Sequence, residues 1–539
     1  MDLKEHLKIE SKDINILIDS LQNPSNKMET QLRDIYGEDQ EFIRDRKNTY
    51  LNTLSYFKET FKEGKVILIR TPARINLMGV HIEHRGGYTN YLSIGKEIIA
   101  AAERRDDDLV KIHNVDKKYS PQEFSIQEEI PPEKRGNWIK FIKEAKIIPG
   151  DWGNYVRAAV FALQNKFSRI NLKGMNIIFN GNIPPSAGLS SSSAMVVTTA
   201  LAILNLNKLS ISREELVELC GEGEWYVGTR GGWGDHAAMI YGKRNYISHL
   251  RFFPFKIDFI PFPSGFRVIS SNSMVEASKS AGAKSIFNGR VATYEIALML
   301  IKKNFPSLKE TKYLRDINPD YLGEKEDFIY KILKTLPKKI TRKELLKELP
   351  DYENKLNELF KTHKEPADGY KVKEVCLFGL AECERSKICV KLLENSEMEK
   401  FGELMYISHD GDRIVSYNKE GKKKLWNNSV DDEKLNKLIE DARSKDSKRI
   451  IKAHLYRQPG GYGCSCEELD FIVDTARRIK GVVGAGLTGG GLGGCVLILV
   501  KEDKVEEVIK KIIRKYYYPR NLEPAIDICI PIEGAGILG

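Results

Sequence analysis

The stretch Asn182-Ile-Pro-Pro-Ser-Ala-Gly-Leu-Ser-Ser-Ser-Ser-Ala-Met195 is the most informative segment of this chain. A strand-like run at 175–179 precedes it, and an apolar, helix-like run at 195–206 follows it. Gly188 permits a tight turn, and the serines then open the helix. The first N–H groups of a helix lack intrahelical partners, and its dipole favours negative charge there. The segment therefore predicts a phosphate-binding helix start or, alternatively, an ordinary N-cap with additional serines.

Two further glycine-containing segments support the phosphate interpretation. The first is Arg70-Thr-Pro-Ala-Arg-Ile-Asn-Leu-Met-Gly-Val-His-Ile-Glu-His-Arg-Gly-Gly87, where a strand expected at 66–70 enters a polar turn. The second is Gly484-Ala-Gly-Leu-Thr-Gly-Gly-Gly-Leu-Gly-Gly-Cys495, expected to join a helix at 467–479 to a strand at 496–500. A dinucleotide fingerprint needs a strand before its glycines and a helix after them, so Rossmann binding is disfavoured. The sequence also contains no Walker A pattern.

In this order, the three segments resemble the motifs of the GHMP kinases, and within that superfamily those of the galactokinase branch. Weaker similarities are Gly232-Trp-Gly-Asp235, Met405-Tyr-Ile-Ser-His409 and Cys464-Ser-Cys-Glu-Glu-Leu-Asp470. The resemblance covers residues 50–300 and 370–539. It implies an α+β fold of two α/β domains with the active site between them. The N-terminal domain would resemble ribosomal protein S5 domain 2, and the C-terminal domain would be ferredoxin-like.

Patterning along the chain indicates how these domains are arranged. Residues 1–48 are polar with helical spacing, and we expect an added N-terminal helical arm. The N-terminal domain is expected at 49–265 and the C-terminal domain at 266–539. Two segments, 303–370 and 414–460, look inserted relative to the family, and the first of them is helical in pattern.

Composition bounds the class of protein. Of the 539 residues, 41% are hydrophobic and 30% charged, which is typical of soluble globular proteins. No apolar run approaches the roughly 18–20 residues of a membrane helix, and the N-terminus lacks the layout of a signal peptide, so a cytoplasmic enzyme is expected. Eight cysteines do not make a disulfide framework in so long a chain. The net charge of +10 is modest and no nucleic-acid-binding motif accompanies it. The sequence leaves the oligomeric state open.

The resemblance implies an ATP-dependent sugar kinase that phosphorylates an anomeric hydroxyl and uses Mg²⁺. Asp235 aligns with the catalytic aspartate of the family, and Arg74 aligns with the arginine that pairs with it. The residues expected to bind the ATP phosphates are Pro184, Gly188, Leu189, Ser190, Ser191, Ser192, Gly489 and Gly491.

The resemblance also implies a metal site. Ser192 aligns with the serine that coordinates Mg²⁺. The family's glutamate partner lies twelve residues before the aspartate, where this chain has Gly223 between Glu222 and Glu224. A shift of one residue favours Glu224, and the alternative is that both glutamates are surface charges.

The sugar is less well defined by the resemblance. Galactokinases read Gly-Glu-His-Thr-Asp-Tyr where this chain reads Gly79-Val-His-Ile-Glu-His84, and a family tyrosine aligns with Phe287. The Val80 side chain cannot accept a hydrogen bond from the sugar's 6-hydroxyl. It suits galacturonate, a pentose or a 6-deoxy sugar instead. Galactose stays open but is disfavoured by these residues. The expected substrate-binding residues are Val80, His81, Glu83, Gly232, Asp235 and Phe287, and the arginines considered for a C6 carboxylate are Arg85, Arg230 and Arg290.

Two functions of other classes fit the same motifs. One is a GHMP kinase for a non-sugar alcohol such as an inositol. The other is a galactokinase-like sugar sensor that does not catalyse phosphoryl transfer. The intact Asp235, Arg74 and phosphate loop disfavour the sensor.

Overall fold

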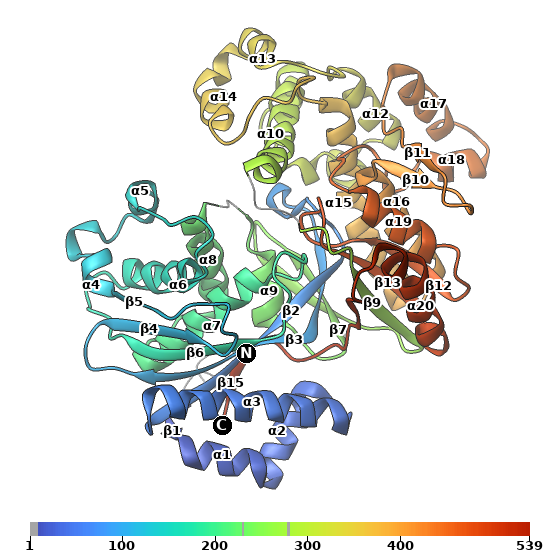
Figure 1. Ribbon diagram of the computed structural model, residues 1–539. Coiled ribbons are helices and arrows are strands. Elements are labelled where there is room, and N and C mark those ends of the chain that lie inside the picture. The colour runs from blue at the N-terminus through green and yellow to red at the C-terminus, as the bar shows by residue number, and fades with distance from the viewer. Residues whose placement is uncertain (1–8, 229–230, 277–280) are drawn as a thin grey trace.

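The computed structural model describes residues 9–228, 231–276 and 281–539 of the chain (Figure 1). A large mixed sheet organises the first part of the chain, and a smaller antiparallel sheet organises the second. The large sheet has the order β1-β2-β3-β6-β4-β5, with β15 beside β2 and the β7–β8 hairpin beside β3. Its strands are β1 (Lys12–Asp13), β2 (Lys65–Met78), β3 (Thr89–Arg104), β4 (Leu109–Asn114), β5 (Gln122–Ser125), β6 (Met175–Gly181), β7 (Tyr246–Arg251), β8 (Lys256–Pro261) and β15 (Gly536–Leu538).

The central strand β2 is buried on both faces. Ile67 and Ile69 pack into the core beneath the helices that follow β6, whereas Val66 and Leu68 pack against the N-terminal arm. A strand covered on both faces can be apolar without alternation, which explains its continuous apolar run. The strand expected at 66–70 therefore extends to Met78 and includes Arg74.

Helices cover the two faces of this sheet. Figure 1 shows the arm on one face and α6 to α8 on the other. The arm comprises α1 (Ile14–Gln22), α2 (Asn26–Tyr36) and α3 (Gln40–Phe61). The boundary expected after residue 48 falls inside α3, whose apolar face continues to pack through Phe57. The other helices of this part are α4 (Ile126–Glu129), α5 (Trp138–Glu144), α6 (Gly153–Lys166), α7 (Ser191–Leu206), α8 (Arg213–Gly223) and α9 (Gly234–Tyr241).

The smaller sheet has the order β12-β13-β9-β14 and is antiparallel throughout. Along β13, Val496, Ile498 and Val500 pack in a cluster with α19 and α20, whereas Leu497 and Leu499 share a cluster with residues of α16. Successive side chains of a strand point to opposite faces of the sheet, so this alternation places β13 between two layers of helices. The elements are β9 (Phe266–Asn272), β12 (Val482–Leu487), β13 (Cys495–Lys501), β14 (Ile526–Ile528), α15 (Val372–Glu394), α16 (Met398–Asp412), α19 (Glu467–Ala476) and α20 (Val505–Ile512).

The segments expected as insertions form a helical layer with its own apolar core. Residues 303–370 are helical as predicted, and they pack with α10, α15 and α17. Residues 414–460 hold the β10–β11 hairpin followed by α17 and α18. The elements are α10 (Ala281–Asn304), α11 (Pro319–Leu322), α12 (Glu326–Lys334), α13 (Arg342–Glu348), α14 (Glu353–Phe360), β10 (Val415–Tyr417), β11 (Lys423–Leu425), α17 (Asp432–Ala442) and α18 (Ser447–Ala453).

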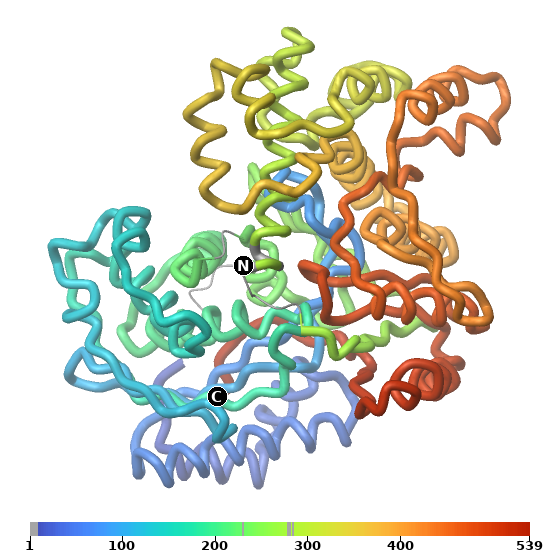
Figure 2. The backbone as a smooth tube through the Cα atoms, turned by 45° about the horizontal axis from the view of Figure 1, so that its top comes forward, coloured from blue at the N-terminus to red at the C-terminus, as the bar shows by residue number. Residues whose placement is uncertain are grey.

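The C-terminal segment returns to the first part of the chain. After β14 it crosses back so that β15 pairs with β2, and Figure 2 shows the C-terminus beside the arm. The expected C-terminal domain at 266–539 thus ends in a strand of the N-terminal sheet. Among the helices that the structure describes, none is both long and apolar enough to cross a membrane.

Candidate active site

A cavity of about 350 Å³ lies where the phosphate loop, the end of β2, α9, α10 and the β12–β13 connection meet. That volume is in the range of small-molecule sites. Most of the expected site residues line it: Arg74, Val80, His81, Glu83, Gly188, Ser190, Ser191, Ser192, Glu224, Gly232, Asp235, Phe287, Gly489 and Gly491. Pro184 and Leu189 do not line it, and Leu189 is buried in the core, where it anchors the loop.

The phosphate loop joins β6 to α7 through two residues in the left-handed conformation. Gly188 has φ of 78° and Ser190, the N-cap of α7, has φ of 60°. The Ser190 hydroxyl donates to Asp235 and does not cap the helix. The N–H groups of the first turn of α7 therefore have no side-chain cap, which is the arrangement of an anion-binding helix start.

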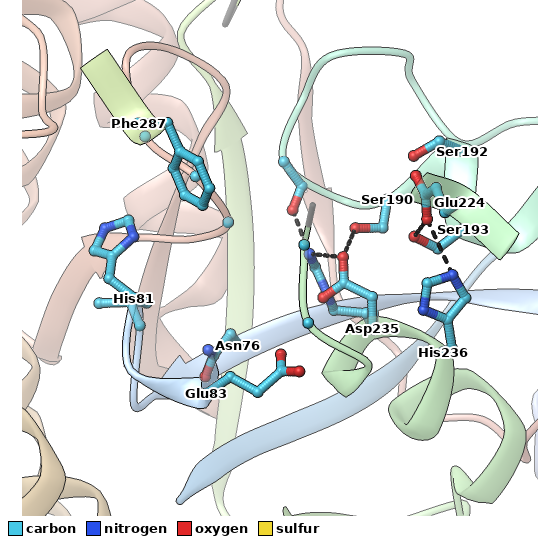
Figure 3. A pocket seen from close by; sticks show the side chains of 18 of the residues that line it. Asn76, His81, Glu83, Ser190, Ser192, Ser193, Glu224, Asp235, His236 and Phe287 are labelled. Carbon is cyan, nitrogen blue, oxygen red and sulfur yellow. Dashed lines mark hydrogen bonds and ion pairs between the residues drawn. The ribbon is translucent and has the colours of Figure 1, made fainter. Parts of the chain in front are cut away.

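Arg74 and Asp235 both line the cavity and form a bidentate ion pair; Figure 3 shows Asp235 beside Ser190. Arg74 Nε and Nη2 donate to Asp235 Oδ1 and Oδ2 at 2.7 and 2.6 Å, and Nη1 donates to the carbonyl of Gly188 at 2.6 Å. Burial by itself raises the pKa of Asp235, but Arg74 and the Ser190 hydroxyl outweigh it and hold that pKa below its usual value. Asp235 is thus an ionised carboxylate linked through Arg74 to the phosphate loop.

Glu83 lies across the cavity from the phosphate loop, at the start of a short 3-10 helix (Glu83–Arg85). Its Oε1 accepts from the N–H of Gly234 at 2.8 Å. A β-carbon on Gly232 would lie 1.9 Å from Glu83 Oε1, so the glycine permits this close approach. Burial and, after it, the charge of Asp235 raise the pKa of Glu83 to about 7.

The loop that carries Val80 and His81 is fixed by a residue far along the chain. Glu382 of α15 is fully buried, and its Oε1 accepts from the N–H groups of Gly79 at 2.8 Å and Val80 at 3.2 Å. The His81 ring stacks on Tyr462 with centroids 4.3 Å apart. The sequence interpretation assigned no role to Glu382, and the signal that marks it is its Glu-x-x-Arg spacing with Arg385, which donates to its second carboxylate oxygen.

The arginines considered for a C6 carboxylate do not reach the cavity among the described residues. Arg85 pairs with Glu295, and Arg290 lies by Cys464 and Gly463. Arg230 lies outside the described residues. Val80 and Phe287 instead give the end of the cavity near His81 an apolar character.

The third glycine segment connects β12 to β13. The expected connection from a helix is wrong, because β12 contains Gly484 and Gly486 and pairs antiparallel with β13. No helix follows the glycines, so the dinucleotide fingerprint is still excluded. A β-carbon on Gly188 would lie 2.8 Å from the carbonyl oxygen of Thr488, and the Thr488 hydroxyl accepts from the N–H of Asn76 at 3.0 Å. The segment therefore packs directly on the phosphate loop and on β2.

Glu224 lies beside the serines at the start of α7. Its Oε2 accepts from Ser193 Oγ at 2.8 Å and lies 3.0 Å from His236 Nε2. Burial by itself raises the pKa of Glu224, but His236 and the serine hydroxyls lower it below its usual value. Glu222, the alternative, does not line the cavity. Sequence reasoning assigned no role to Ser193 or His236.

This group of oxygens fits Mg²⁺ when its other ligands are phosphate oxygens and water. Mg²⁺ is commonly held by one or two carboxylates plus substrate phosphates. Glu224 supplies one buried, ionised carboxylate, and Ser192 supplies a hydroxyl on the same wall of the cavity. Within the described ranges, no cluster of three histidine, cysteine or acidic residues could hold a metal ion without such outside ligands.

Comparisons with known proteins agree with the fold. Residues 154–243 match the GHMP kinases N terminal domain, and residues 435–519 match the GHMP kinases C terminal domain. The chain belongs to the GHMP kinases. Residues 55–104 match the galactokinase galactose-binding signature. Within the superfamily the chain is a member of the galactokinase branch, and it is a sugar kinase.

Curated and solved relatives cover nearly the whole chain. The galactokinase of Dictyostelium discoideum is 26% identical over 516 residues, 90% of this chain and 90% of that protein. The galactokinase of Fusobacterium nucleatum is 26% identical over 489 residues, 90% of this chain and 98% of that protein. The structure of Lactococcus lactis galactokinase in complex with galactose matches with a TM-score of 0.64 at 22% identity, over 89% of this chain and 97% of that one. That match confirms the expected two-domain fold.

Proposed function

We propose that the chain transfers the γ-phosphate of ATP to the anomeric hydroxyl of a galactose-configured sugar. The observation that carries this proposal is the Arg74–Asp235 pair, which joins an ionised carboxylate to the carbonyl of Gly188 in the phosphate loop. Asp235 accepts the proton of the sugar hydroxyl as the phosphoryl group is transferred. The Arg74 guanidinium keeps that carboxylate ionised and stabilises charge that develops on the phosphate.

The remaining roles follow from position in the cavity. The ATP phosphates bind the N-terminus of α7 beside Ser190 and Ser191, and Gly489 and Gly491 line the same cavity. Ser192 and Glu224 hold Mg²⁺, which neutralises phosphate charge when it is bound.

Galactose is the sugar that the relatives support, since the curated proteins that match over most of their length are galactokinases. In our proposal the ring hydroxyls of the sugar donate to Glu83, and its C6 group faces Val80. The Val80 side chain is 5% exposed and offers no hydrogen bond, which supports a 6-deoxy sugar or a pentose as the alternative substrate. Among the residues that the structure describes, a galacturonate carboxylate would lack a cation at this end, because Arg85 and Arg290 do not line the cavity.

The phosphoryl-transfer role is tested with Asp235→Asn. We expect turnover to fall about 10²–10⁴-fold, the range for loss of a positioned general base, while ATP still binds. Asp320→Asn, on the exposed pair with Lys387, is the matched control and should keep full activity. Turnover of Asp235→Asn at the wild-type level, with chemistry shown to limit the rate, would remove Asp235 from this role.

The choice of sugar is tested with the double variant Val80→Glu, Glu83→Asp. It restores both acids that galactokinases carry, so the ratio of kcat/KM for galactose to that for galacturonate should rise at least tenfold. The physical reason is that the glutamate introduced in place of Val80 would accept from the 6-hydroxyl and repel a C6 carboxylate. If wild type prefers galactose and the double variant leaves the ratio unchanged, residues 80–83 do not recognise C6.

A further inference from the structure

Glu224 has a neighbour that no motif of the chain accounts for. His236 lies directly after Asp235 on α9, and its side chain is 2% exposed. Its Nε2 is 3.0 Å from Glu224 Oε2, although the ring is turned so that neither nitrogen makes a well-aligned hydrogen bond to a described residue. Ser193 Oγ donates to the same carboxylate oxygen at 2.8 Å.

Both neighbours therefore contact one oxygen of the carboxylate and leave the other to the side of Ser192. Figure 3 shows Ser193 and His236 on one side of Glu224 and Ser192 on the opposite side. The contacts that Ser193 and His236 make to Oε2 limit rotation of the Glu224 carboxylate. Its other oxygen is therefore kept toward Ser192 and the cavity. Residues that contact metal ligands in this way orient them and tune the affinity of the site.

We propose that His236 is a positioning residue for the metal: it holds Glu224 Oε2 so that the other oxygen faces Mg²⁺ at the phosphate loop. The proposal rests on the metal role given to Glu224 above. His236 does not itself contact the reacting atoms. Its contribution is to orient a ligand that begins the short helix Glu224–Val227 and whose carboxylate is held by side chains.

The test measures metal binding without turnover. Mn²⁺ is titrated into the protein with a non-hydrolysable β,γ-imido analogue of ATP, and free Mn²⁺ is followed by electron paramagnetic resonance. His236→Ala should weaken Mn²⁺ binding about 10–100-fold, the usual effect of removing a residue that orients a metal ligand. His236→Gln should keep most of the affinity, because its amide N–H can reach the place of Nε2. His236→Asn, with the same amide on a side chain one methylene shorter, should behave like alanine.

A matched control comes from a second histidine–glutamate pair. His454 Nδ1 lies 2.8 Å from Glu326 Oε2 on the helical layer, far from the phosphate loop in sequence, so His454→Ala should bind Mn²⁺ like wild type. If His236→Ala fails to fold, the comparison of His236→Gln with His236→Asn carries the test. Equal affinity in these two variants, or wild-type affinity in His236→Ala, would overturn the proposal.

Glu224→Ala distinguishes the metal-binding role of Glu224 from the positioning role of His236. If it loses Mn²⁺ affinity while His236→Ala does not, Glu224 is the ligand and His236 only packs. If Glu224→Ala binds Mn²⁺ normally, the metal assignment itself is wrong and the positioning role is wrong with it. In either case the Asp235→Asn result still decides the phosphoryl-transfer proposal independently.

Discussion

At the scale of single residues, the pKa values of two carboxyl groups in one cavity are shifted in opposite directions. Arg74 and Ser190 hold the pKa of Asp235 low, whereas burial raises the pKa of Glu83 to about 7. Carboxyls whose environments separate their pKa values commonly have different roles. Asp235 can accept a proton at any pH near neutrality, while Glu83 changes charge within that range.

Sugar binding should therefore depend on pH through Glu83. Because the raised pKa keeps the carboxyl neutral below about 7, ionised Glu83 becomes available to accept sugar hydroxyls only as the pH rises through that value. KM for the sugar should fall about tenfold between pH 6 and pH 8, because the ionised fraction of a carboxyl group with a pKa of about 7 rises about tenfold over that range. Initial rates with varied sugar at saturating ATP give this profile.

Glu83→Gln is the control for this dependence, since its amide does not titrate. Its KM for the sugar should be flat over the same range, while KM for ATP should change equally in both proteins. A variant that keeps the wild-type slope would show that another group titrates.

Residues in the motifs could be predicted from sequence, because each motif is a local pattern of a reactive residue and glycines. Arg74 and Asp235 both lie in the cavity as expected. Glu382 and His236 could not be predicted in the same way. Glu382 acts on the N–H groups of residues about three hundred positions earlier, and His236 acts through a glutamate on another helix. Such partners are set only by tertiary packing.

At the scale of elements, the site depends on close contact between two glycine turns. The phosphate loop contacts the β12–β13 connection backbone to backbone at Gly188 and Gly489. Periodicity predicted α7 and β13 well, because each has a long apolar pattern. It missed β12, whose glycines have no side chains to give an alternating signal. It also ended β2 too early, because polar residues of that strand face the cavity.

Gly188→Ala should test this contact. The added methyl would lie 2.8 Å from a backbone carbonyl that cannot move away easily, at a φ of 78° that side chains rarely adopt. We expect a stability loss of about 1–3 kcal/mol and a rise in KM for ATP of about tenfold or more, with a smaller change in KM for the sugar. Thermal unfolding and steady-state kinetics measure the two effects.

Gly150→Ala isolates the backbone strain. Gly150 has φ of 80°, but a β-carbon there meets nothing within 4 Å. This variant should lose only stability and keep the wild-type KM for ATP. Equal kinetics in Gly188→Ala and Gly150→Ala would show that contact between the two turns does not matter for nucleotide binding.

At the scale of the whole molecule, the arm, β2, β3 and the C-terminal segment meet at one buried charged group. Arg70 of β2 donates to Glu97 of β3 at 2.6 Å and to the carbonyls of Glu533 and Gly534. Tyr36 of the arm donates to the same Glu97 at 2.8 Å and contacts the hydroxyl of Tyr50. The arm, both central strands and the C-terminal segment therefore share one buried charged group. Sequence patterns predicted that the arm is helical but gave no sign of this junction, because Glu533 and Gly534 lie more than four hundred residues after Arg70.

Tyr36→Phe should show that this junction supports the fold and not the chemistry. Removing the hydroxyl leaves Glu97 Oε2 without that donor at a fully buried site, and an unmet buried hydrogen bond costs about 1–3 kcal/mol. The thermal unfolding midpoint should fall accordingly, whereas kcat and both KM values should stay near wild type because Tyr36 does not line the cavity. Tyr321→Phe, at a tyrosine that is 65% exposed, is the matched control and should change neither quantity.

Glu97 also has a backbone carbonyl that accepts from Asn182, the first residue of the phosphate loop segment, at 3.1 Å. A Tyr36→Phe variant with normal stability but a raised KM for ATP would therefore mean that the arm acts on the phosphate loop through Glu97, and that the junction belongs to the active site.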